Sequence, residues 1–369
     1  TVPLGLIFLG TVAASLPTSK VMRERGRKFG FVYGHLIGAF GAAVCVVATA
    51  PGFRSFAVLC VGSFGMGLAN CSAFLFRFAA SEVSTPEFRP KAISLVLSGG
   101  VVAAVVGPQV MVPAKDWFGT DSFGGAYLMM GLLYVCSALL VTQVSFPTAP
   151  VNTPNSPDAP EDVQFSTLVK TMRCISALAT SAIAYSNMLI IMAPTPLAMK
   201  NDDFSFNQST LVMVCHFLGM FVPGFVTGKV VEKIGPVATG LCGNALFFVS
   251  FVILLPARPL VSYFLALITL GVAWNLQFTA GTAMVATLSK EYPKLSHKLQ
   301  ATNDMTLFTL SGIWTLISGL LLESIGFTAM LWIAIAYAGL GTVMIMLQKV
   351  SAPSTSSQQQ PQQPQQPQQ

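Results

Sequence analysis

The stretch Ser19-Lys20-Val21-Met22-Arg23-Glu24-Arg25-Gly26-Arg27-Lys28 holds five basic residues within ten positions. It lies between two apolar runs, 1–16 and 29–50. A short basic segment between apolar runs is typical of a turn at one face of a membrane, because charged side chains are costly inside the hydrocarbon. The stretch therefore predicts a helical membrane protein whose chain turns back into the bilayer here.

This basic segment has a second copy later in the chain. Gly228-Lys229-Val230-Val231-Glu232-Lys233-Ile234-Gly235 keeps the lysine, the valine and the final glycine, 209 residues further along. It also lies between two apolar runs. A repeat at about half the chain length indicates a transporter built from two similar halves.

The composition supports a membrane location. The 369 residues are 53% hydrophobic and 9% charged, whereas about 25% of residues are charged in soluble domains. A soluble fold could not bury that much apolar surface. The net charge of +6 is distributed over short loops, so we expect no nucleic-acid partner. None of the seven cysteines has the spacing of metal ligands, and we expect no metal and no other cofactor.

Eleven apolar segments are candidates for membrane-spanning helices. They are 1–16, 29–50, 56–76, 92–112, 124–144, 172–197, 209–231, 236–255, 260–288, 301–322 and 327–347. The third contains Gly62, Gly65 and Gly67, which favour close packing of helices in lipid. The predicted fold class is therefore all-α integral membrane.

The charges of the loops predict the orientation. Sixteen of the twenty basic residues fall on one side, and the other side holds only Arg54, Lys115, Lys200 and Arg258. The positive-inside rule makes the first side cytoplasmic, which puts Thr1 outside and Lys349 inside. Eleven spans then imply one missing helix before Thr1, twelve in all. Helices are numbered here as if that first one existed, so 1–16 is helix 2.

Four segments follow from this assignment. Residues 1–146 are the N-terminal half with helices 2–6, and 166–349 are the C-terminal half with helices 7–12. Residues 147–165, rich in proline, are predicted to be a cytoplasmic linker. Residues 350–369, rich in serine, proline and glutamine, are predicted to be a disordered cytoplasmic tail.

The two basic segments resemble the signature of the major facilitator superfamily, Gly-x-Leu-x-Asp-Arg-x-Gly-Arg-Arg between helices 2 and 3. The first copy fills it with Ser19, Val21, Arg23, Glu24, Gly26, Arg27 and Lys28, and the second with Gly228, Val230, Glu232, Lys233 and Gly235. The resemblance covers 1–347 and implies a fold of two six-helix halves, here lacking helix 1, that carries out secondary transport.

Further stretches resemble one branch of the superfamily, the generic bacterial-type permeases that include riboflavin transporters. They are 77–82, 90–94 with Gly99-Gly100 and Gly107-Pro108-Gln109, Gly271-Val272-Ala273-Trp274-Asn275 and Gln300-Ala301-Thr302-Asn303-Asp304. Gly107 and Pro108 are also expected to bend helix 5. They match in part a motif of proton-driven drug antiporters.

One departure from the signature suggests a gate. Arg23 stands where the superfamily has an aspartate that faces the start of helix 11. We expect Asp304, near that start, to supply the anion that Arg23 needs. In the second half Glu232 would face Lys91 at the start of helix 5. These pairs would latch the cytoplasmic gate while the outer side is open; the alternative is that Asp304 is only a helix cap.

In the resembling fold helices 1, 4, 7 and 10 line the central cavity. Their candidate substrate-binding residues here are Asn70 and Phe74 in helix 4, Asn187 in helix 7, and Trp274, Asn275 and Gln277 in helix 10. Phe74 and Trp274 could hold a flat ring between them, while the amides offer neutral donors and acceptors. The alternatives are hydrogen bonds between helices for the amides and ordinary packing for the aromatic rings.

His216 is the candidate for proton coupling, because histidine titrates near neutral pH. It lies within helix 8, and its alternative is a neutral histidine bonded to a neighbouring helix.

The leading function is a secondary transporter of a small organic solute, neutral or aromatic as riboflavin is, working by alternating access. A proton-coupled drug or metabolite exporter and a non-transporting receptor or scaffold are the alternatives. The expected partners are the solute, a coupling proton and the lipid bilayer, and we expect a monomer in the plasma membrane. No motif of an enzyme or of an ATP-driven pump is present, so we expect no enzymatic activity.

Overall fold

The computed structural model describes residues 1–76, 79–80, 89–119, 123–146 and 164–350, and these are helical without any strand. The helices of the first part are α1 (Val2–Arg25), α2 (Arg27–Thr49), α3 (Phe56–Phe74), α5 (Arg89–Ala114) and α6 (Gly124–Gln143). Those of the second part are α7 (Phe165–Leu168), α8 (Met172–Met192), α9 (Thr195–Asn201), α10 (Phe206–Phe221), α11 (Gly224–Leu254), α12 (Leu260–Glu291), the 3₁₀ turn η1 (Pro293–Leu295) and α13 (Ser296–Val350).

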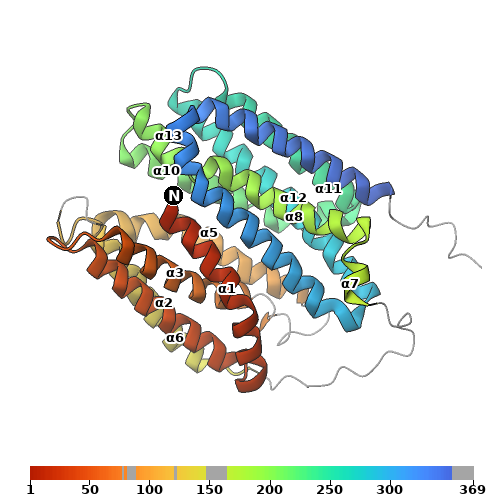
Figure 1. Cartoon of the computed structure of the whole chain (residues 1–369), viewed down its shortest axis with the longest axis horizontal. Helices are drawn as coiled ribbons and strands as arrows, with labels where there is room; N and C mark the ends of the chain where they lie inside the picture. The colour runs from red at the N-terminus through yellow and green to blue at the C-terminus, as the bar shows by residue number, and fades with distance from the viewer. Residues whose placement is uncertain (77–78, 81–88, 120–122, 147–163, 351–369) are drawn as a thin grey trace, which may run out of the picture.

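The helices form two bundles that lie side by side (Figure 1). In the N-terminal bundle α2 packs against α3 and α6, and α1 packs against α3. In the C-terminal bundle α12 packs against α10 and α11, and α8 packs against α12 and α13. The bundles meet where α1 runs along α13 and where α5 contacts α10. This interface is where a site shared by both halves would lie.

The basic segment is mostly helix rather than loop. Lysine and arginine are good helix formers, so α1 continues through the segment to Arg25. The chain reverses at Gly26 alone, with φ 87° and ψ 159°, and α2 begins at the next residue. Gly235 has nearly the same conformation, φ 83° and ψ 160°. Glycine adopts such positive φ values without steric cost, so the sequence repeat is also a repeat of backbone geometry.

Eight helices in the described part are long and apolar enough to cross a membrane. One of these stretches, Lys298–Gln348, has 51 residues. At 1.5 Å per residue it is far longer than the roughly 30 Å of a bilayer core. It is broken at Gly326, with φ 77° and ψ 165°, where the two long segments of α13 meet (Figure 1). A count of eleven spans stays a prediction.

Glycine allows the helices of each bundle to approach closely, as expected for the third apolar segment. A Cβ atom on Gly67 would lie 2.2 Å from the carbonyl oxygen of Ile7, and one on Gly62 would lie 2.7 Å from that of Gly41. In the C-terminal bundle a Cβ on Gly271 would lie 2.5 Å from the His216 carbonyl oxygen. Any larger residue would push these backbones apart.

The bundles touch at the end opposite Gly26 and Gly235. The Gly319 backbone N–H donates to Thr1 Oγ1 at 3.1 Å, which joins the start of α1 to α13. The Phe206 ring lies edge-on to Phe123 at 6.1 Å. Lys115 Nζ lies 5.5 Å from the centre of the same Phe206 ring. These contacts hold together the ends that the loop charges assign to the outer face.

Candidate functional site

Aromatic side chains from both bundles pack against one another where the bundles meet. We call them the aromatic cluster; its members are Phe8 of α1, Phe74 of α3, Tyr185 of α8, Phe221 of α10, Trp274 and Phe278 of α12, and Phe308 of α13. Two of these rings come from the N-terminal bundle and five from the C-terminal bundle. The cluster is therefore built by both halves together.

Trp274 is packed among three rings of the cluster. It stacks on Phe278, one turn further along α12, with ring centres 4.9 Å apart and an interplanar angle of 7°. Tyr185 and Phe221 meet it edge-on at 5.5 and 6.2 Å. Trp274 is 7% exposed, and its Nε1–H finds no acceptor in the described part of the chain. An unpaired buried donor among aromatic rings suits a flat ligand that carries an acceptor.

Phe74 belongs to the cluster but does not face Trp274. Ring contacts run from Phe74 to Phe308 at 4.8 Å, from Phe308 to Tyr185 at 6.0 Å, and from Tyr185 to Trp274 at 5.5 Å. Two rings thus separate the pair that was expected to hold a flat ligand directly. A ligand between Phe74 and Trp274 would have to displace Phe308 or Tyr185.

Tyr185 is the residue that the sequence reasoning missed. It contacts Phe8, Trp274, Phe278 and Phe308, so it links the two bundles. Every other residue from Thr180 to Ile191 is buried, whereas Tyr185 is partly exposed. Its position near the middle of α8, two residues before the candidate Asn187, is the feature of the sequence that could have identified it as a site residue.

Asn70 and Asn275 make hydrogen bonds between helices. Asn70 Nδ2 donates to Thr11 Oγ1 at 3.2 Å. Asn275 Nδ2 donates to the Met220 carbonyl oxygen at 2.7 Å, and its Oδ1 accepts from Thr227 Oγ1. Thr11 and Met220 are 209 residues apart, the repeat distance of the two halves. Both amides therefore make the hydrogen bonds between helices that the sequence analysis gave as the alternative to substrate binding.

Asn187 and Gln277 retain free hydrogen-bonding capacity. Both are fully buried. Neither amide atom of Asn187 has a partner among the described residues. Gln277 Nε2 donates to the Thr180 carbonyl oxygen at 3.3 Å, while its Oε1 has no partner there. Because buried amides are normally satisfied, these two are the better candidates for a ligand.

His216 is held inside the C-terminal bundle. Its Nδ1 lies 2.7 Å from the Leu267 carbonyl oxygen, so Nδ1 carries the hydrogen and donates. The ring is fully buried, and Nε2 has no partner among the described side chains. This geometry accounts for a neutral histidine that joins α10 to α12. The role of His216 in proton coupling stays a prediction.

Gly107 and Pro108 lie within α5. The bend expected at these two residues also stays a prediction.

The expected gate pairs are described only in part. The side chains of Arg23 and Lys91 lie outside the described part of the structure. Glu232 is exposed and forms no ion pair with any described side chain. Both pairs therefore stay predictions.

Asp304 is not a helix cap. The sequence analysis begins this helix at residue 301, but α13 begins at Ser296, so Asp304 lies in its third turn. A carboxylate so far from the helix start cannot bond the free N–H groups of the first turn. Its described contact is with the neighbouring side chain: Asn303 Nδ2 donates to Asp304 Oδ1 at 3.1 Å.

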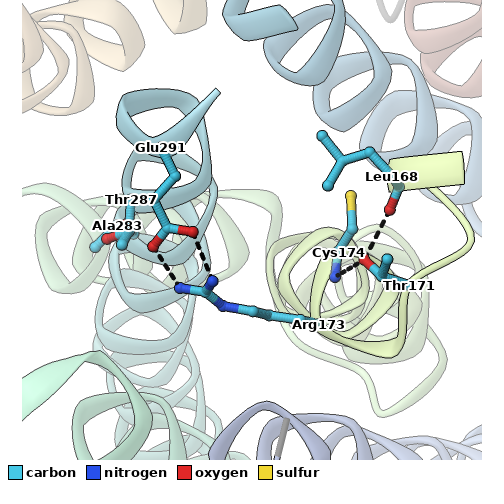
Figure 2. Close-up of polar contacts among 7 residues, drawn as sticks. All are labelled: Leu168, Thr171, Arg173, Cys174, Ala283, Thr287 and Glu291. Atoms are coloured by element: carbon cyan, nitrogen blue, oxygen red, sulfur yellow. Dashed lines mark hydrogen bonds and ion pairs between the residues drawn. The ribbon is translucent and has the colours of Figure 1, made fainter. Parts of the chain in front are cut away.

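An ion pair ties α8 to α12 at the cytoplasmic end of the C-terminal bundle. Figure 2 shows Arg173 reaching Glu291 with both terminal guanidinium nitrogens, Nη1 to Oε2 at 2.6 Å and Nη2 to Oε1 at 2.7 Å. Parallel bonds of this kind are the strongest form of a surface ion pair. Sequence reasoning did not find this pair, because its partners are 118 residues apart.

A second polar group lies at the outer end of this bundle. Asp202 Oδ2 accepts from Arg258 Nε at 3.1 Å and from the Tyr263 hydroxyl at 2.7 Å. Burial raises the pKa of Asp202, but the hydrogen bonds and the charge of Arg258 outweigh it and leave that pKa below its ordinary value. These contacts join the end of α9 to the start of α12.

Comparison with known proteins defines the family. The family model of the Major Facilitator Superfamily matches residues 2–294 and 174–368. The riboflavin transporter RfnT of Brucella anthropi is 31% identical over 351 residues, which cover 94% of this chain and 86% of that protein. The uncharacterized transporter YddS of Bacillus subtilis is 27% identical over 325 residues, covering 84% of this chain and 73% of YddS.

Solved structures show the same fold. The transporter FucP in its outward conformation aligns with a TM-score of 0.63 at 15% identity, covering 96% of this chain and 90% of FucP. With these relatives and apolar helices, the chain is a multi-pass integral membrane protein and not an enzyme, as predicted, and the plasma membrane is its expected location. The chain therefore belongs to the major facilitator superfamily of transporters.

Proposed function

We propose that this chain transports a small, neutral, aromatic solute of the riboflavin type by alternating access. The observation that carries the proposal is the buried Nε1–H of Trp274, which finds no acceptor among the described residues and lies inside a cluster of rings supplied by both bundles. The name of the relative from Brucella anthropi points to the same solute.

The chemistry of the site suits such a solute. The members of the aromatic cluster are uncharged, so a strongly charged substrate would find no counter-ion among them. A flat ring system can stack on Phe278 or Trp274 and meet Tyr185 edge-on. A ring carbonyl would accept the Trp274 hydrogen. The Asn187 amide and the Gln277 Oε1 atom, which have no partner among the described residues, offer further polar contacts.

Alternating access requires the two bundles to separate at one end while they close at the other. At the outer end they meet through side chains, Phe206 against Phe123 and Lys115. Contacts between side chains can be broken without unfolding a helix.

The test is uptake of radiolabelled riboflavin into liposomes that contain the purified protein. Trp274→Phe keeps the ring and removes the N–H. Losing one buried hydrogen bond of about 1 kcal/mol should raise KM about fivefold. The matched control is Trp332→Phe, because Trp332 is 59% exposed and outside the cluster; its KM should not change.

Two results would contradict the proposal. One is an absence of riboflavin uptake by the wild-type protein. The other is equal KM values for the wild type and Trp274→Phe. Uptake or export of lipophilic cations in place of flavins would favour the exporter function instead.

A further inference from the structure

One face of α2 is apolar and exposed over the whole length of the helix. We call it the α2 stripe; its side chains are Phe29, Tyr33, Leu36, Phe40, Ala43 and Val47. Their spacing of three or four residues puts them on one face. The helices that pack against α2 are α1, α3 and α6, and α2 lies on the side of its bundle that faces away from the C-terminal bundle (Figure 1). In a membrane protein such a stripe contacts the acyl chains of lipids.

Two basic side chains lie at the end of the α2 stripe that the loop charges assign to the cytoplasm. The Arg25 guanidinium carbon lies 5.1 Å from the centre of the Phe29 ring. Phe29 stacks on Tyr33, with ring centres 6.0 Å apart and an interplanar angle of 9°. Lys28 is also exposed, and its Nζ donates to the Thr142 carbonyl oxygen at the end of α6, at 2.7 Å. The cation of Arg25 is therefore held against the first ring of the stripe.

Both basic side chains keep donors for an anion. Arg25 forms no hydrogen bond or ion pair with any described residue, so its guanidinium N–H groups are available. The Lys28 ammonium has three N–H groups, and the Thr142 carbonyl accepts one of them. Glu24, the acidic residue nearest in the sequence, lies 4.0 Å from Lys20, which offsets its charge. This end of the stripe therefore carries net positive charge.

The second copy of the turn has none of these features. Gly235 reverses the chain with nearly the same φ and ψ as Gly26. The residues that correspond to Arg25, Lys28, Phe29 and Tyr33, 209 positions later, are Ile234, Val237, Ala238 and Cys242. The backbone reversal therefore requires neither the cations nor the rings, and their presence at the first turn has a separate cause.

We propose that this end of α2 binds the headgroup of an anionic phospholipid, whose acyl chains lie along the α2 stripe. The lipid phosphate accepts hydrogen bonds from Arg25 and Lys28, and the planar guanidinium group suits a phosphate well. Because the site is positively charged, it favours a lipid with net negative charge over a zwitterionic one. Phe29 and Tyr33 suit the membrane interface, where aromatic rings are enriched. The site is separate from the aromatic cluster and does not depend on which solute is transported.

The experiment is native mass spectrometry of the full chain in detergent, with phosphatidylglycerol or phosphatidylcholine added. The lipid preference is the ratio of the Kd for phosphatidylcholine to the Kd for phosphatidylglycerol. Arg25→Gln should lower this preference about fivefold, because one cation near the membrane surface is lost. Arg25→Lys should lower it less, since the charge remains. The matched control is Lys233→Gln, an exposed basic residue at the second turn, which should leave the preference unchanged.

Two further measurements separate lipid binding from loss of fold and from binding of a free anion. Without lipid, Arg25→Gln should melt at the same temperature as the wild type, because the side chain is exposed and has no described polar partner. Added phosphatidylglycerol should raise the Tm of the wild type more than that of Arg25→Gln. Glycerol phosphate should not displace the lipid, because it lacks the acyl chains that contact the stripe.

Three outcomes would overturn the proposal. The wild type and Arg25→Gln could have the same lipid preference. Lys233→Gln could lower the preference as much as Arg25→Gln does, which is the result expected for general attraction by the basic face. Glycerol phosphate could displace phosphatidylglycerol, which would show that the basic residues take a free anion and that the stripe contributes nothing.

Discussion

Exchanging Arg173 and Glu291 should preserve or raise stability, although each single charge reversal should lower it. Arg173 is the second residue of α8, and Glu291 is the last residue of α12. A helix begins with partial positive charge and ends with partial negative charge. Each side chain is therefore at the unfavourable end of its own helix, and their mutual bonds offset that cost (Figure 2).

The magnitude follows from exposure and geometry. The Arg173 and Glu291 side chains are 19% and 39% exposed, so solvent screens the pair in part. With two parallel bonds, a coupling free energy of about 1 kcal/mol is expected. Reversing one charge loses that coupling and sets like charges against each other, which costs about 2 kcal/mol. Arg173→Glu with Glu291→Arg restores the pair and gains about 0.3–1 kcal/mol from each helix dipole.

The assay is reversible unfolding by SDS in mixed micelles, on the wild type, both single reversals and the double exchange. The double exchange should be as stable as the wild type or more so, and high salt should reduce the differences. Additive destabilisation, with the double exchange as unstable as the sum of the single reversals, would show that the two groups do not interact and would refute the reasoning.

Two further predictions concern packing and pH. Gly67→Ala would place a Cβ 2.2 Å from the Ile7 carbonyl oxygen, so it should destabilise the protein by about 1–3 kcal/mol in the same unfolding assay. The control is Gly339→Ala, whose added Cβ meets nothing within 4 Å. This variant should be neutral or stabilising by up to about 1 kcal/mol, because alanine favours helix more than glycine does. The pKa of Asp202 is lowered in the folded state from its ordinary value of 3.8 by Arg258 and Tyr263, so its contribution to stability is present above that value and is lost as pH falls below it. Asp202→Asn should therefore flatten the loss of stability at acidic pH, and an unchanged acid profile would count against this.

The sequence predicts the fold well where the prediction depends on which segments avoid water or lipid and on the backbone conformations that glycine allows. Long apolar runs must avoid water, and charged loops must avoid lipid, so the membrane class could be predicted without tertiary contacts. The repeat was also informative, because Gly26 and Gly235 share a positive φ that favours glycine. Helix ends are harder to predict: the sequence analysis assigns the basic residues before Gly26 to a turn, whereas they continue α1, because lysine and arginine favour helix.

The candidate site needed the three-dimensional contacts. Asn275 and Asn187 are the same residue type on two helices of one bundle, yet Asn275 bonds α10 and α11 while Asn187 has no partner among the described residues. The difference comes from which backbone groups the neighbouring helices present. Tyr185 likewise became a central residue through rings from three other helices, α1, α12 and α13.

The sequence thus sufficed for properties that depend on each segment's own chemistry: its burial in lipid and its charge at the membrane face. Which polar groups are satisfied, which rings meet and which charges pair came from the tertiary structure. These properties depend on distances between residues such as Arg173 and Glu291, which are 118 positions apart and are brought together by helix packing.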